Sequence, residues 1–170
     1  MKTIFFLFLT LVVISCGNKG DDLNTLNEDE LSWKIEEYYT QKDIKNTITC
    51  INLFTDKFPQ NPKSPEYLSN LALIYTNELK DLNLAVTQYK RIINDFPQAK
   101  ETPNAFFTLG FIYNNELKDY NSAKYYYEEF IKRYPNHEAV QSARFELETM
   151  GKSADDIINK LQNNQSESSK

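Results

Sequence analysis

Few side chains in this sequence could carry out chemistry. Its 170 residues include one histidine and two cysteines. A thiol could act as a nucleophile, a redox centre or a site of covalent modification, a histidine could ligate a metal, and adjacent carboxylates could share acid and base roles. The residues to consider are Cys16, Cys50, His137, Glu36–Glu37 and Glu128–Glu129.

The spacing of these residues does not favour catalysis. His137 follows Pro135 in a stretch expected to turn, so we expect a solvent-exposed ring with no second metal ligand nearby. Both acidic pairs stand beside aromatic residues at helical spacing, which predicts the solvated face of a helix. Among only four glycines there is no GxSxG motif and no phosphate-binding loop. We therefore predict no catalytic residue, no metal site and no cofactor.

Cys16 ends an N-terminal apolar stretch. The run Ile4–Ile14 is shorter than the ~20 residues that span a bilayer, and it fits the core of a signal peptide. Val13-Ile14-Ser15-Cys16 resembles a bacterial lipobox, with valine where leucine is usual. That resemblance implies cleavage before Cys16 and acylation of the new N-terminal cysteine, which would anchor the protein by lipid alone. An ordinary secretory signal with an incidental cysteine is the alternative.

The chain divides into four segments on this view. They are a lipoprotein signal peptide (1–15), a lipidated cysteine with a flexible tether rich in glycine, asparagine and acidic residues (16–30), a helical domain (31–161) and a disordered tail (162–170). Gly17 after the cysteine resembles the sorting signal for the outer membrane. We expect the periplasmic face, and exposure on the cell surface stays open.

Cys50 has a different expected role. With Cys16 carrying lipid, no partner remains for a disulfide, and Cys50 stands among Ile48, Ile51 and Phe54. This pattern predicts a buried apolar filler rather than a redox centre.

The rest of the chain is organised by an internal repeat. Residues 104–135 repeat the stretch that begins at Glu66, at a spacing of 38 residues, and Asn-Glu-Leu-Lys-Asp is identical at 77–81 and 115–119. A period of roughly 20–50 residues is typical of arrays in which each unit buries its apolar face against its neighbours. Within each unit, two apolar stripes at helical spacing predict a helix pair, closed by Pro97 or Pro135.

The unit resembles the tetratricopeptide repeat (TPR) family. The matching residues are Phe106, Leu109, Gly110, Tyr113, Ala123, Tyr127 and Pro135. The turn between Tyr113 and Ala123 is one residue longer than usual, and so is that between Tyr75 and Ala85. The resemblance implies an all-α, right-handed solenoid of antiparallel helix pairs, with about three and a half repeats.

We expect eight helices. Leu31–Pro59 is a weaker terminal copy of the unit, in which we predict that Trp33, Ile35 and Tyr38 face inward. Ser153 and Asp156 have the spacing of a capping box at the start of the last helix. The first helices are expected near 31–41, 66–79, 103–117 and 137–150, and the second helices near 44–58, 82–96, 120–134 and 153–163.

One apolar strip exceeds what packing requires. Phe107 and Phe111 lie off the main stripe of their helix, and Leu73 holds the place of Phe111 in the preceding unit. In TPR arrays the first helices line a concave groove, so the resemblance implies a partner-binding groove at Leu73, Asn77, Phe107, Phe111, Asn114 and Asn115. The alternative is that the C-terminal helices fold back and cover the strip.

These features predict a non-enzymatic adaptor. The net charge of −5 and the scattered basic residues exclude a nucleic-acid surface. The chain resembles BamD-type and YbgF-type TPR modules of the bacterial envelope, although it has fewer repeats than the first and lacks the coiled coil of the second. The expected partner is an envelope protein or peptide in the groove. Self-association through the terminal repeats is an alternative, an accessory subunit of an envelope enzyme is a weaker one, and the oligomeric state is open.

Overall fold

The described part of the structure, a computed structural model, is entirely helical. It covers residues 22–153, 155, 156 and 158. The elements are η1 (Leu23–Thr25), α1 (Glu28–Thr40), α2 (Ile44–Lys57), α3 (Ser64–Asn77), α4 (Leu82–Asp95), α5 (Thr102–Phe111), η2 (Ile112–Glu116), α6 (Tyr120–Arg133) and α7 (Val140–Thr149). The all-α helix-pair fold predicted from the sequence is confirmed.

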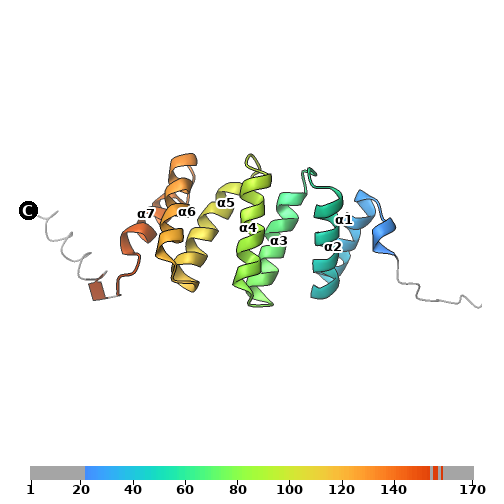
Figure 1. Ribbon diagram of the computed structural model, residues 1–170, viewed down its shortest axis with the longest axis horizontal. Helices are drawn as coiled ribbons and strands as arrows, with labels where there is room; N and C mark the ends of the chain where they lie inside the picture. The colour runs from blue at the N-terminus through green and yellow to red at the C-terminus, as the bar shows by residue number, and fades with distance from the viewer. Residues whose placement is uncertain (1–21, 154, 157, 159–170) are drawn as a thin grey trace, which may run out of the picture.

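The helices stand in a row from α1 to α7 (Figure 1). Each packs chiefly against the helices next to it in the chain, so that the contacts run α1–α2, α2–α3, α3–α4 and onward to α6–α7. Three helix pairs therefore form the array, and α7 begins a fourth unit. The nearest-neighbour contact pattern is that of a solenoid.

The second helix of each pair begins in the same way. Asp43, Asp81 and Asp119 stand 38 residues apart, and each side chain accepts a hydrogen bond from a backbone N–H in the first turn. The lysine before each aspartate has a left-handed backbone, with φ of 55–57° at Lys42, Lys80 and Lys118. The lysine turns the chain and the aspartate caps the next helix, so the repeat extends to backbone conformation.

The extra residue of the second and third units lies at the end of their first helix. In the first unit the Asp43 N–H donates to the Tyr38 carbonyl at 2.9 Å, five residues back. Asp81 and Asp119 reach six residues back instead, to Tyr75 and Tyr113. The insertion widens the last turn, which in the third unit becomes the π-helical η2.

The connectors between units also follow the period. The Ser64 hydroxyl donates to the Phe58 carbonyl at 3.2 Å, and the Thr102 hydroxyl to the Phe96 carbonyl at 2.6 Å. Both hydroxyl residues are buried, and a proline follows each in the first turn of α3 or α5. These bonds fix the angle at which each new pair begins.

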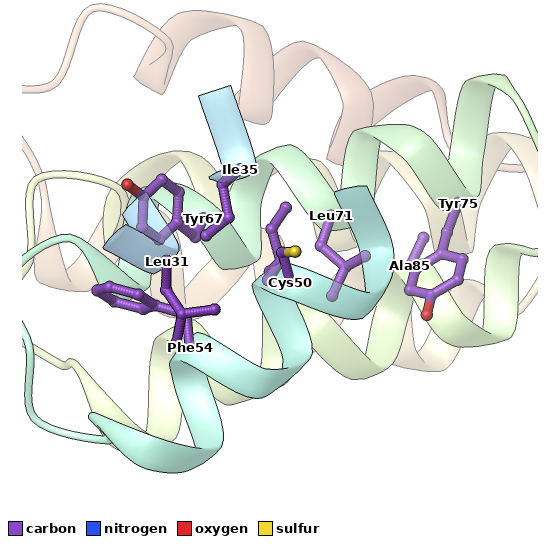
Figure 2. Packing of buried hydrophobic residues seen from close by; sticks show 9 residues of the cluster. Leu31, Ile35, Cys50, Phe54, Tyr67, Leu71, Tyr75 and Ala85 are labelled. Atoms are coloured by element: carbon purple, nitrogen blue, oxygen red, sulfur yellow. The ribbon is translucent and has the colours of Figure 1, made fainter. Parts of the chain in front are cut away.

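The core consists of three clusters along the row. In the first, Leu31 and Ile35 of α1 lie with Cys50 and Phe54 of α2 and with Tyr67 of α3, as Figure 2 shows. Cys50 is fully buried, as predicted, and burial raises the pKa of its thiol. The protonated thiol is a packing group in this site.

Gly110 permits a close crossing of α5 and α6. A β-carbon built at Gly110 would lie 2.7 Å from ring atoms of Tyr127, which is fully buried. Only glycine therefore fits at this position with the tyrosine as it stands. The sequence-based expectation of a close approach at Gly110 is confirmed.

The start of the helical domain differs from the prediction. Leu23 and Leu26 pack against the first cluster, and the Lys57 ammonium donates to the carbonyls of Asn24 and Leu26 at 2.9 and 2.7 Å. Asn27 begins α1 through a reciprocal capping box with its third residue. The predicted boundary at residue 31 is therefore wrong, because residues 22–30 are docked on α2.

The inward orientation predicted for the first helix is correct only in part. Ile35 is buried and Tyr38 is half-buried, but Trp33 is 61% exposed. Trp33 lines an open pocket with Lys63 and Glu66 at the start of α3, so its ring stays in contact with solvent.

The C-terminal end follows the prediction as far as it is described. Gly151 has a positive φ of 72° just after α7, and the backbone N–H groups of Ser153 and Asp156 bond reciprocally to each other's side chains at 3.2 Å. The predicted capping box is thus present. Most of the helix expected at 153–163, the tail, and residues 1–21 with Cys16 lie outside the described residues.

Candidate protein-interaction groove

A groove of about 390 Å³ lies between the first two helix pairs. It is lined by residues from the end of α1, the following turn, the start of α2 and the second half of α3. We call it the Tyr39–Leu73 groove, and its lining residues are Tyr39, Lys42, Ile44, Leu73, Ile74, Asn77 and Glu78.

Two large apolar side chains are presented to solvent there. Tyr39 is 50% exposed and Leu73 is 47% exposed. Each has a neighbour turned the other way: Tyr38 packs against the first core cluster, and Ala72 is fully buried in the second. Burial of the neighbour fixes the rotation of each helix, which leaves Tyr39 and Leu73 outside the core.

Polar groups lie beside this apolar pair. Lys42 stands at the left-handed turn, and Asn77 and Glu78 end α3. The lining thus offers apolar contact together with an amide, a cation and an anion. That mixture suits a polypeptide segment, which brings its own backbone amides and side chains of both kinds.

The two phenylalanines of the predicted strip differ in environment. Phe111 is 42% exposed, at the position of α5 that matches Leu73 of α3. Phe107 is half-buried, and its ring meets those of Tyr127 and Phe130 edge-on, each at a centroid distance of 5.7 Å. Phe107 belongs to the third core cluster, so the expectation that it is an exposed anchor is wrong.

Asn114 also lies outside the predicted groove. It is buried, and its amide donates to Glu146 Oε2 of α7 at 2.8 Å. Burial raises the pKa of Tyr127, and the negative charge of Glu146 raises it further. The neighbouring Asn115 bonds back to the Phe111 carbonyl at 3.3 Å. The helix α7 therefore contacts Asn114, while Phe111 and Leu73 of the strip stay exposed, so the alternative of a covered strip applies to Asn114 alone.

The structure therefore brings together only part of the predicted site. Leu73 and Asn77 line one groove, Phe111 is exposed on the next first helix, and Phe107 and Asn114 are in contact with other helices. Tyr39, Lys42, Ile44 and Glu78 were missed. The adjacent tyrosines at 38 and 39 carried a signal, because only one of two neighbours on a helix can face the core.

Two of the residues that were considered for chemistry, His137 and Glu129, take part in packing or in hydrogen bonds within the fold. His137 is half-buried rather than fully exposed, because its ring packs on Phe130 at 5.2 Å and its Nδ1 accepts the Ala139 N–H at 3.2 Å. Glu129 accepts hydrogen bonds from Arg133 and Lys132, which lower its pKa. Within the described ranges, no three His, Cys, Asp or Glu residues are placed to hold a metal ion.

Comparison with known proteins agrees with the repeat architecture. A tetratricopeptide repeat family profile matches residues 66–99 and 104–137, which contain α3–α4 and α5–α6. No curated protein matches the chain. Among the helices that the structure describes, none has the length and apolar character needed to cross a membrane.

Proposed function

We propose that this chain is a non-enzymatic adaptor of the bacterial cell envelope that binds a segment of another envelope protein in the Tyr39–Leu73 groove. TPR repeats generally bind protein partners, and two such repeats match here. The observation that carries the proposal is the pair of exposed apolar side chains, Tyr39 and Leu73, beside polar groups in one groove. Exposed anchors of this kind contribute most of the affinity in many interfaces.

The envelope location is part of the proposal. Its support is the sequence Val13-Ile14-Ser15-Cys16 after a short apolar run, which resembles a lipobox. In this proposal Cys16 carries lipid, the outer membrane holds the anchor, and the helical domain faces the periplasm or the cell surface.

The groove is tested by crosslinking in intact cells from a photoreactive residue at position 73, with the captured protein identified by mass spectrometry. We expect one dominant partner, and its capture should fall about tenfold in Tyr39→Ser, because loss of an exposed anchor costs ~1–2 kcal/mol of binding. The matched control is Leu84→Ser, which alters a similarly exposed residue on α4, outside the groove. Equal loss in both variants, or no captured protein, would refute groove binding.

The anchor is tested by incorporation of radiolabelled palmitate. We expect label in the wild-type chain and none in Cys16→Ala, since the thiol is the acylation site. Label in neither protein would remove the lipid anchor from the proposal and leave groove binding to stand on its own test.

Self-association is a second candidate, favoured by exposed aromatic residues on the terminal helices α1 and α7. Trp33 on α1 is 61% exposed and Phe145 on α7 is 49% exposed. If copies join through these ends, light scattering during size-exclusion chromatography should show a mass that grows with concentration, and Trp33→Ser should abolish the growth. A constant monomer mass would exclude this candidate.

A further inference from the structure

A second pocket, of about 450 Å³, lies between α4 and α6 with Phe106 of α5 in its wall. It shares no residue with the Tyr39–Leu73 groove. We call it the Lys90–Arg133 pocket. Two cations and no carboxylate line it, in a chain whose net charge is −5. Its lining residues are Lys90, Ile93, Asn94, Phe106, Tyr125, Tyr126 and Arg133.

Lys90 is held in place by aromatic rings rather than by an acid. Its ammonium lies 5.6 Å from the ring centroid of Tyr113, and that ring stacks on Tyr126 at 5.6 Å with planes only 3° apart. Hydrogen bonding with Tyr113 raises the pKa of Lys90, which keeps the ammonium charged. Among the described residues, no carboxylate lies within salt-bridge distance of Lys90. Hydrogen bonds from Ser122 and, as a smaller cause, the charge of Lys90 lower the pKa of the Asp119 carboxyl.

Arg133 supplies the second cation. Its guanidinium carbon lies 5.0 Å from the ring centroid of Phe106, and its Nε donates to Glu129 at 2.8 Å. Within the described residues, the hydrogen-bond partner of this guanidinium is Glu129 alone, through Nε. The two terminal amino groups are thus free to donate to a bound oxyanion.

The neighbouring pocket between α2 and α4 offers a comparison for the charged groups of the Lys90–Arg133 pocket. It has about 480 Å³ and is lined by Arg91, but Arg91 already contacts Asp56 at 3.9 Å and donates to Gln88 and Thr55 at 3.2 and 3.4 Å. One repeat earlier, the positions of Lys90 and Arg133 hold Asn52 and Asp95. Arg133, like Arg91, has an acidic partner, so the pockets differ at Lys90, which forms no salt bridge with a described carboxylate and has no counterpart one repeat earlier.

We propose that the Lys90–Arg133 pocket binds an acidic segment of a partner protein that carries an aromatic side chain. Its carboxylates would meet Lys90 and the terminal amino groups of Arg133, and its ring would pack on Ile93 and Phe106. Charge complementarity selects the acidic partner, and the apolar wall selects the ring. Two cations are fewer than the roughly four to eight that mark binding to anionic membranes, so a protein segment is favoured over a lipid surface.

The test uses the full chain with isotope-labelled isoleucine methyl groups, titrated with the blocked peptide N-acetyl-Glu-Phe-Glu-amide. We expect the Ile93 methyl resonance to shift, with binding about fivefold weaker in Lys90→Gln and weakened by salt, because exposed ion pairs are screened. Arg91→Gln is the matched control and should bind like the wild type. Lys90→Arg, which keeps the charge, should retain most of the affinity.

Three results would overturn the proposal. The first is equal binding of N-acetyl-Gln-Phe-Gln-amide, which lacks the carboxylates. The second is an equal loss in Arg91→Gln and Lys90→Gln. The third is Lys90-dependent binding of phosphatidylglycerol vesicles without peptide binding, which would assign the pocket to lipid. Substitution of Leu73 should leave the peptide affinity unchanged, so this test is separate from that of the Tyr39–Leu73 groove.

Discussion

The second and third helix pairs have nearly the same sequence pattern and yet present different surfaces. Leu73 of α3 and Phe111 of α5 occupy equivalent positions, and both are exposed. One turn earlier, however, Ser69 of α3 corresponds to Phe107 of α5, and Phe107 packs in the core. A residue outside the main apolar stripe of its helix thus lines a groove or packs in the core, depending on its size and on the helix that follows.

The next helix matters in the same way for the polar residues. Thr76 of α3 donates to the Ala72 carbonyl of its own helix at 2.9 Å. The equivalent Asn114 reaches across to Glu146 of α7 instead. The third pair is therefore tied to its successor by a partly buried side-chain hydrogen bond, for which the second pair has no equivalent at Thr76.

The substitution with the largest expected effect on stability is at Phe107. Phe107→Ala should lower the free energy of unfolding by about 3 kcal/mol, at the low end for a truncated phenylalanine because the ring is only half-buried. Phe111→Ala, the exposed control on the same helix, should cost less than ~1 kcal/mol. Urea denaturation followed by circular dichroism measures both. Similar costs for the two variants would contradict the assignment of Phe107 to the core.

The helix crossing in the third pair gives an intermediate effect. Gly110→Ala should destabilise the protein by about 2 kcal/mol, because the new methyl group would overlap the buried ring of Tyr127. Ala72, at the same place in the second pair, already carries a β-carbon. Combining Gly110→Ala with Tyr127→Leu makes room for the methyl group, so the two substitutions should cost less together than the sum of each alone. Strict additivity in thermal melts would contradict the clash.

The smallest effect concerns the bond to α7. Asn114→Ala should cost about 1 kcal/mol and should also speed amide hydrogen exchange throughout α7, since it removes a buried partner of Glu146. Thr76→Ala is the matched control, because its hydroxyl bonds only within α3. Unchanged exchange in α7 would show that this bond does not hold the helix in place.

The repeat and its helices could be predicted because their causes are local. The 38-residue period, the capping aspartates and the prolines after each unit act within a few residues of the chain, and six of the seven described helices match the expected ranges to within about three residues at each end. The same local reasoning found Gly110 and Cys50 as packing positions. It failed at residues 22–30, where docking depends on Lys57, which is 33 residues from Asn24 in sequence, and on the first core cluster.

The sequence by itself determined the period, the helix pairs and the side of each helix that must be buried, because apolar spacing and capping are properties of the chain. Only the tertiary structure decided which remaining side chains meet solvent. Trp33 is exposed beside the start of α3, Asn114 is buried where it meets Glu146 of α7, and Lys90 lies over the ring of Tyr113 and forms no salt bridge with a described carboxylate. The physical reason is that a helix has several faces, and whether a face is buried depends on which other unit of the array packs against it.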